Sequence, residues 1–485
     1  MPKNEVKSLV KLCASSIAKT IQTMVAHFMI SLIGLVECFV KLGSSYIKQT
    51  IENRKFDLSA FNLIKDNAIY LSFNSVHKKF EPFRHLPHNL LEEIVECFTR
   101  SKKPVNIIML DHLITSQRQR LSFSVYSDTY LSLFPKLENL LELNFDNTEI
   151  GFDCLKSIGI YCSKLRLLNL EKCANVTDDG IQCLFGGAEY PELGNGKAKL
   201  CRTLQKLNIS STSVTQRGIQ MALKYLLCLQ IIEHENTFET LVVLAQLNSR
   251  RGRCNMDKLS LSTLCSLCDK PYVNGSLQLA LSMCDSITLI YIYTTKGFID
   301  NDLLCLMSIK TLRGLKIFSS PKYNYNIGIT FKGGLLPLLK VIGKSLKNLS
   351  FYCFDYVRIS EIAKFCPNLT ELHISNDRNW LEDEGNFFKM EKKLPIFRQL
   401  TFLSCHYRFP SHILHFLLSS PLLQDICFSY CKTLTNEVLQ KAANYHGFEK
   451  LKKLDLQRCN AVSEREINVL LAKHNPLKEF CVTIR

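Results

Sequence analysis

The stretch LRLLNLEKCANVT, residues 165–177, decides the fold of this chain, because two close copies of it recur far away in the sequence. One copy is LQKLNISSTSVT from Leu204, and the other is LKKLDLQRCNAVS from Leu451. Each copy places apolar residues at offsets 0, 3 and 5 and a small or polar residue at offset 8. Side chains alternate along a strand, so offsets 3 and 5 share one buried face. Each copy therefore predicts a short strand and a turn, and the Thr or Ser that follows suits a helix N-cap.

This pattern is typical of leucine-rich repeats, in which every repeat contributes a strand, a turn and a helix. The first apolar residues of the repeats fall at positions 140, 165, 204, 229, 256, 287, 312, 346, 369, 397, 423, 451 and 477. We therefore expect an α/β solenoid, a horseshoe of about 13 repeats over residues 121–485 that follows an N-terminal α-helical region. The repeats at 256, 287 and 312 are the least regular. Leu121, Phe123 and Val125 are expected to add a strand at the N-terminal end of the solenoid.

Many of the 21 cysteines fall at repeated positions, which distinguishes them from a disulfide framework. Offset 8 holds Cys173, Cys405, Cys431 and Cys459, and the position three residues before a repeat holds Cys162, Cys201 and Cys366. Both positions are internal in a solenoid, where a thiol behaves as a small apolar group. Reduced thiols indicate a reducing compartment, so we expect the protein in the cytoplasm, the nucleus or both.

The charge of the chain is basic but dispersed. There are 60 Lys and Arg against 44 Asp and Glu, a net charge of +16. A dispersed excess predicts a solvated basic surface, and we expect no nucleic-acid site.

The apolar run at residues 21–36 is shorter than the roughly 20 residues of a membrane span and is closed by Glu37 and Lys41. A buried helix is expected there, with a membrane-associated segment as the alternative.

Residues 1–120 have a helical pattern, and the segment SLVKLCASSI at residues 8–17 is the first candidate for function. Leu9, Cys13 and Ile17 are spaced by four, so they line one face of a helix. This spacing resembles the elongin-binding box of cullin-RING ubiquitin ligase receptors, which implies that these three residues dock elongin C. The alternative is an ordinary amphipathic helix.

The second candidate is LPHNLLEEIVECF at residues 86–98, where Pro87 suits the first turn of a helix with one apolar face. Leu86, Pro87, Leu90 and Ile94 resemble the opening helix of an F-box, and they also satisfy the looser pattern of a cullin-selecting box. An F-box usually carries a Trp nearby, whereas the single Trp of this chain is Trp380. The alternative is a helix that caps the end of the solenoid.

Together these segments and the cysteine-containing repeats resemble substrate receptors of cullin-RING ligases of the F-box, Amn and Zyg types. The chain departs from the Zyg type because no armadillo-like region follows the repeats. The resemblance implies a substrate-recognition subunit that binds elongin B/C or the F-box adaptor, each with a cullin, and a protein substrate. The alternative is a leucine-rich-repeat scaffold or inhibitor outside the ubiquitin system.

The substrate would lie on the concave strands, where offsets 2, 4 and 6 point away from the core. The first repeats place acidic and amide residues there, among them Glu142, Asn144, Asp146, Asn169 and Glu171. The central repeats place the candidate substrate-binding residues there: Tyr291, Tyr293, Lys316, Phe318 and Tyr352. Aromatic residues on a rigid face suit a protein-binding site. The alternative is a register shifted by one residue, which would turn the tyrosines inward.

Signals for catalysis, metals and cofactors are weak. Cys265 and Cys268 form a single CxxC without a second pair at zinc spacing. The Gly-rich stretch LFGGAEYPELGNGK lacks the ending of a phosphate-binding loop. We therefore expect a non-catalytic protein with no cofactor, no metal and no small-molecule ligand.

Overall fold

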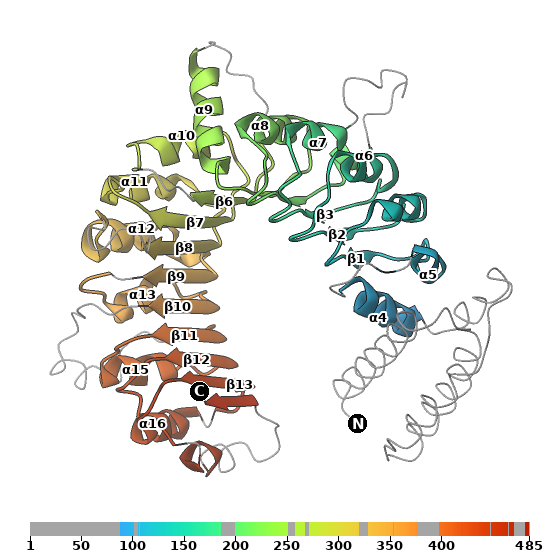
Figure 1. Cartoon of the computed structure of the whole chain (residues 1–485). Helices are drawn as coiled ribbons and strands as arrows, with labels where there is room; N and C mark the ends of the chain where they lie inside the picture. Colours follow the sequence, from blue (N-terminus) through green and yellow to red (C-terminus); the bar gives the residue numbers. More distant parts are fainter. Residues whose placement is uncertain are drawn as a thin grey trace, which may run out of the picture. The chain divides into compact units, whose positions relative to one another are not determined.

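The computed structural model describes residues 88–100, 105, 107–185, 199–250, 258–266, 271–319, 328–352, 354–375, 397–446, 448–463, 465–469 and 481–484. The chain divides into two compact units, Met1–Leu229 and Gln230–Arg485. Each unit has the leucine-rich-repeat architecture that the sequence predicts, with short parallel strands that alternate with helices (Figure 1).

The first unit begins with two helices and continues as a repeat array. Its elements are α4 (His88–Thr99), α5 (Ile107–Leu113), β1 (Arg120–Ser122), η2 (Asp128–Lys136), β2 (Glu142–Asn144), α6 (Phe152–Tyr161), β3 (Leu167–Asn169), α7 (Asp178–Cys183), η3 (Lys199–Arg202), β4 (Lys206–Asn208) and α8 (Gln216–Tyr225). Strands β1 to β4 pair in parallel in chain order. The strand expected around Leu121 is therefore present as β1, at the N-terminal edge of this sheet.

The second unit contains a nine-stranded parallel sheet in the order β6 to β14. The nine strands of the sheet are β6 (Thr263–Ser266), β7 (Leu289–Thr294), β8 (Gly314–Ser319), β9 (Asn348–Tyr352), β10 (Glu371–Ser375), β11 (Phe402–His406), β12 (Asp425–Ser429), β13 (Lys453–Gln457) and β14 (Cys481–Ile484), and strand β5 (Ile231–Glu233) precedes them in this unit. Its helices are α9 (Thr237–Arg250), α10 (Ser276–Ser282), α11 (Asp300–Leu304), η4 (Cys305–Ser308), η5 (Phe331–Leu335), α12 (Leu336–Ile342), η6 (Gly343–Ser345), α13 (Ile359–Phe365), α15 (Ser411–Leu418) and α16 (Asn436–His446). The helices from α10 to α16 follow one side of the sheet (Figure 1).

The core is a stack of equivalent leucines. In the first unit Leu143 is in register with Leu168, which is in register with Leu207, and all three are fully buried. The second unit has an equivalent stack of Leu372, Leu403, Ile426 and Leu454. A residue at offset 3 therefore contacts its own equivalents in the neighbouring repeats of its unit.

In several repeats the residue at offset 7 from the start given by strand pairing turns the chain out of the strand in a left-handed conformation. The φ angle is +59° at Lys172, +77° at Tyr407, +59° at Tyr430 and +54° at Arg458. In this conformation the backbone N–H of Lys172 donates to the Ser210 carbonyl, and that of Tyr430 donates to the Gln457 carbonyl. These bonds tie each turn to the next one, so they offset the cost of a left-handed non-glycine residue.

The cysteines at offset 8 are buried as predicted. The Cys173 thiol donates to the Phe145 carbonyl over 2.9 Å, and the Cys459 thiol donates to the Phe428 carbonyl over 3.7 Å. Each thiol thus reaches back to the strand of the preceding repeat. Burial raises the pKa of Cys459 to about 11 and that of Cys366 to about 12, so these thiols stay protonated near neutral pH. Within the described ranges the cysteines are free of disulfides.

Three of the predicted repeat starts are wrong. Strand pairing aligns Leu264 with Ile290, so the repeat assigned to 256 begins at Leu261. It aligns Leu403 with Leu372, so the repeat assigned to 397 begins at Leu400, and Cys405 lies inside β11 at offset 5 instead of offset 8. The last strand begins at Cys481, two residues later than a start at 477 implies. The repeat at 397 offers two overlapping sets of apolar residues that fit the pattern, and the pairing between strands selects one. The other two corrected registers put Ser266 at offset 5 and Glu479 at offset 0, so the apolar pattern points away from them and only strand pairing reveals them.

None of the helices in the described part of the chain is long and apolar enough to cross a membrane. Residues 21–36, for which a buried helix is predicted, lie outside the described residues. Of the expected helical region at residues 1–120, the structure describes the part from His88 onward, in which α4 and α5 are helical.

Candidate functional site

The side chains of strand β7 alternate between two environments. Ile290 and Ile292 are fully buried against the helical layer, whereas Tyr291 and Tyr293 are half-buried on the opposite face of the sheet. We call this opposite face of the β6–β14 sheet the open face. The structure therefore places the two tyrosines outward, and the alternative register that would turn them inward is excluded.

Four rings from three neighbouring strands stack on the open face. Phe318 of β8 lies at the centre, with its ring centroid 5.0 Å from that of Tyr293, 4.9 Å from that of Tyr352 and 6.4 Å from that of Tyr291. The Lys316 Nζ lies 5.0 Å from the centroid of the Tyr291 ring, in cation–π geometry. We refer to Tyr291, Tyr293, Lys316, Phe318 and Tyr352 as the aromatic cluster. All five candidate substrate-binding residues thus lie together.

Strand pairing explains why the cluster forms. Tyr291 is directly opposite Lys316, and Tyr293 is directly opposite Phe318. Residues opposite each other on paired strands have side chains about 5 Å apart, which is the natural spacing of stacked rings. Burial raises the pKa of both Tyr293 and Tyr352, so their hydroxyl groups stay protonated at neutral pH. The cluster is therefore a half-buried, rigid surface of uncharged rings that carries one ammonium group, that of Lys316.

The open face continues past the cluster with His373, whose offset predicts an outward position, and with four residues that the sequence interpretation missed: Phe402, His406, Tyr407 and Tyr430. The His373 ring lies 4.7 Å from that of Phe402, and His406 Nε2 lies 3.1 Å from Ser404 Oγ. Beyond them, the Tyr407 and Tyr430 rings stack with centroids 6.0 Å apart. Phe402 and His406 were missed because the repeat start at 397 put them at the wrong offsets. Tyr407 and Tyr430 were missed because offset 7 was not considered as a surface position.

The two histidines of the open face are neutral at physiological pH. Burial, followed by the charge of Lys316, lowers the pKa of His373 below its ordinary value, although Glu371 opposes this effect. Burial also lowers the pKa of His406, and His406 itself further lowers that of His373. The stacking of His373 on Phe402 therefore involves an uncharged imidazole.

Replacing His373 with glutamine is expected to weaken the acid sensitivity of folding. Because the pKa of His373 is lower in the folded than in the unfolded chain, the unfolded chain binds more protons as the pH falls through the unfolded pKa. The folded state of the natural protein should therefore lose stability between about pH 7.5 and 5.5, and the variant should lose less. Urea unfolding midpoints at the two pH values measure this, and an equal loss in both proteins would refute it.

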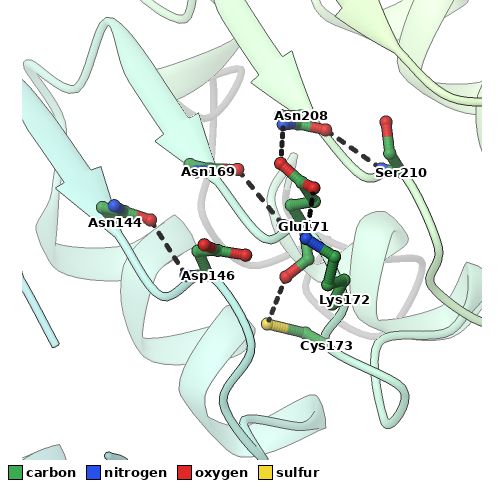
Figure 2. A network of polar contacts seen from close by, with 8 residues as sticks. All are labelled: Asn144, Asp146, Asn169, Glu171, Lys172, Cys173, Asn208 and Ser210. Atoms are coloured by element: carbon green, nitrogen blue, oxygen red, sulfur yellow. Dashed lines mark hydrogen bonds and ion pairs between the residues drawn. The ribbon is translucent and has the colours of Figure 1, made fainter. Parts of the chain in front are cut away.

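The strands of the first unit present a polar network in place of rings (Figure 2). Asn144, Asn169 and Asn208 lie in register on β2, β3 and β4. Each side-chain carbonyl accepts a hydrogen bond from the backbone N–H two residues later, at 2.9 Å, 3.2 Å and 3.1 Å respectively. These bonds hold the turn at the end of each strand, as short polar side chains commonly do.

Glu171 joins two members of this network. Its carboxylate accepts a hydrogen bond of 3.3 Å from the Asn208 amide and forms an ion pair of 2.7 Å with Lys172. The bond from the Lys172 ammonium is the main cause that lowers the pKa of Glu171. The polar groups of this surface are thus largely used within the fold (Figure 2). The aromatic cluster, whose apolar rings remain half-exposed, is the stronger candidate for binding.

The predicted adaptor-binding residues are only partly described. Leu9, Cys13, Ile17, Leu86 and Pro87 lie outside the described residues. Leu90 lies in the first turn of α4. On the same helix Ile94 is only 2% exposed, and Leu91, Val95 and Phe98 are buried with it.

The burial of Ile94 corrects its assignment to an adaptor surface. The apolar face of α4 is turned into the first unit, where α4 contacts α5 and β1. The backbone carbonyl of Thr99, the last residue of α4, accepts a hydrogen bond from the Ser124 N–H. This part of α4 therefore closes the end of the repeat array, which was the alternative interpretation.

Among the residues that the structure describes, no three His, Cys, Asp or Glu side chains are grouped to bind an ion. Cys265 is half-buried on β6, and Cys268 lies outside the described ranges. The chemistry available on the aromatic cluster is apolar contact, hydroxyl hydrogen bonding and a single ammonium charge.

Comparisons with known proteins agree with the fold. A family model described as a leucine-rich repeat matches residues 161–185. No curated protein matches the sequence. One similar solved structure is a leucine-rich-repeat protein of Leptospira interrogans, 17% identical, with 85% of this chain and 100% of that chain covered and a TM-score of 0.33. Another is a chain from the crystal structure of the Rad7 and Elc1 complex in yeast, 14% identical, with 84% and 92% covered and a TM-score of 0.41.

Proposed function

We propose that this leucine-rich repeat protein holds a protein partner against the aromatic cluster and serves as the substrate-recognition subunit of a cullin-RING ubiquitin ligase. The observation that carries the binding half is the stack of four half-buried rings around Phe318 on a rigid parallel sheet. Tyrosine dominates protein-binding hot spots because its ring offers a large contact area at a small entropy cost.

The rigidity of the cluster favours binding over other roles for these rings. Strand β7 pairs with β8 along its whole length, and β8 pairs with β9 from Gly314 to Ile317. The inward side chains of these strands are buried. A surface held in this way loses little conformational entropy when a partner docks. Half-exposed rings that serve only stability would be better buried, so their position on the open face favours a partner that covers them.

The ligase half of the proposal is supported by the resemblance of residues 8–17 to an elongin-binding box. A receptor of this kind supplies no reacting group. It raises the effective concentration of a substrate beside a ubiquitin-loaded enzyme, and a bound partner on one surface with an adaptor on another is sufficient for that. The alternative is a scaffold or inhibitor that uses the same aromatic cluster without an adaptor.

Binding of purified adaptors to the full chain separates these alternatives. We expect immobilised chain to retain recombinant elongin B/C, and Leu9→Asp to reduce the retained amount at least tenfold, because a charge cannot enter an apolar pocket at low cost. The F-box adaptor tested in parallel identifies the other adaptor class, with Leu86→Asp as its matched variant.

The control for these variants is Lys11→Asp, which changes the charge of the same segment outside the Leu9, Cys13 and Ile17 spacing. Circular dichroism of each variant checks that the chain remains folded. Retention of neither adaptor by the natural chain would reject the ligase half and leave the scaffold alternative.

A further inference from the structure

The charge distribution of the open face indicates what kind of protein segment fits the aromatic cluster. Within strands β6 to β9 the residues are TLCS, LIYIYT, GLKIFS and NLSFY, so Lys316 is their single charged residue. No carboxylate of the described residues lies within ion-pair distance of Lys316. Its ammonium group lies over the Tyr291 ring in a cation–π contact. A half-buried ammonium group without a counter-ion is a favourable position for an anion supplied from outside.

The acidic residue of β10, the strand paired with β9, is already engaged. Glu371 lies on β10, and its carboxylate accepts a hydrogen bond from the side-chain amide of Asn348. The charge of Lys316 still reaches His373, the neighbour of Glu371, and disfavours its protonation. Among the described residues, Lys316 therefore remains without an ion-pair partner.

The rings around Lys316 favour a protein segment over a nucleic acid. Phe318 is stacked against Tyr293 at an interplanar angle of 21° and against Tyr352 at 35°. Its two faces are thus covered by neighbouring rings. Single-stranded nucleic acids bind through free ring faces on which bases stack, whereas an apolar side chain can pack against ring edges and hydroxyl-bearing rims.

We propose that the aromatic cluster binds a segment of a partner protein in which an Asp or Glu carboxylate stands beside a large apolar side chain. The carboxylate pairs with the Lys316 ammonium, and the apolar side chain covers Phe318 and the flanking tyrosines. This inference rests on the proposed binding function and specifies the chemical class of its substrate. It does not depend on which adaptor the chain uses.

A charge-swap selection tests the inference. A phage library of random 12-residue peptides, fused so that they have no free carboxyl terminus, is selected on the full chain and on Lys316→Glu. The natural chain should enrich Asp or Glu next to Phe, Trp or Leu, and Lys316→Glu should enrich Lys or Arg at that position. The synthetic consensus peptide should then bind Lys316→Glu at least tenfold more weakly in fluorescence anisotropy.

Lys332→Glu is the matched control, because it makes the same charge change at an exposed residue of η5, away from the open face. It should bind the consensus peptide as the natural chain does. Equal charge preferences of the natural chain and Lys316→Glu, the absence of any enriched peptide, or displacement of the peptide by a 20-residue oligouridine would each overturn the inference. Adaptor binding by the natural chain is measured in a separate experiment. Failure of the natural chain to bind either adaptor would reject the ligase half of the proposed function and leave this inference intact.

Discussion

Replacing Phe428 with alanine is expected to lower the free energy of unfolding by about 3–5 kcal/mol, the usual cost of truncating a fully buried phenylalanine. Phe428 lies in the middle of β12 and is 0% exposed. Its backbone is paired with Cys405 on one side and with Leu456 on the other. The paired strands on both sides hold the walls of the cavity that the alanine would leave, so the cavity can shrink only a little. The loss of unfolding free energy should therefore lie near the upper end of this range.

The matched control for Phe428 is Tyr430→Ala, two residues later in the same repeat. Tyr430 is 45% exposed, so its truncation should change the free energy of unfolding by less than about 1 kcal/mol. Urea unfolding followed by circular dichroism measures both variants. Equal losses in the two variants would show that the described packing of β12 is wrong.

The loss in Phe428→Ala should also be local. In a repeat array each repeat contacts only its neighbours, so destabilisation should concentrate around the altered repeat. Hydrogen exchange measured by mass spectrometry should therefore rise most in peptides from β11, β12 and β13. Uniform acceleration over the whole chain would contradict this expectation and would indicate a single cooperative unit.

Replacing Phe318 with alanine is expected to remove binding of the protein partner, with a loss of roughly 2 kcal/mol or more, about thirtyfold in affinity. Phe318 contacts the other three rings of the aromatic cluster, so its truncation also releases Tyr291, Tyr293 and Tyr352 from their stacked positions. A binding surface that loses its central ring loses both contact area and preorganisation.

Quantitative mass spectrometry of proteins that copurify with the full chain from cells measures this effect. Proteins retained by the natural chain, apart from the adaptor and the cullin, should fall at least tenfold with Phe318→Ala. The retained proteins should be unaffected by Tyr225→Ala. Tyr225 lies on α8, is 44% exposed and stacks on Phe185, away from the aromatic cluster. Unchanged retention by Phe318→Ala would show that the partner binds elsewhere on the chain.

Much of the fold could be predicted because the repeat makes each residue position predictable from its offset. The apolar offsets of the copies at 165, 204 and 451 are the buried positions of β3, β4 and β13, and the cysteines at offset 8 are internal. The outward direction of Tyr291 and Phe318 follows from the same alternation. These features are local, since a strand of three to six residues exposes and buries its side chains in turn.

One error arose where two local patterns compete. Phe397 and Leu400 are both fully buried, and either one begins an acceptable series of apolar residues. The pairing of Leu372 with Leu403 decides between them, and this pairing joins segments that are separated by about thirty residues in the sequence. A shift of three residues changes which side chains reach the open face, which is why Phe402 and His406 escaped prediction.

For α4, the sequence pattern predicts the helix but does not predict what its apolar face contacts. Its sequence indicates an amphipathic helix, but an apolar face has the same composition whether it closes a solenoid or binds another protein. The contacts of α4 with α5 and β1 place Ile94 inside the first unit.

The sequence by itself therefore determined the repeat, the parallel strands, the internal cysteines and the face on which the central tyrosines lie. Only the tertiary structure decided the register of the irregular repeats, the burial of Ile94 and the assembly of Phe318 and Lys316 into one cluster with three tyrosines. The physical reason is that alternation within a strand depends on neighbouring residues, whereas strand pairing and burial depend on residues that the chain brings together from a distance.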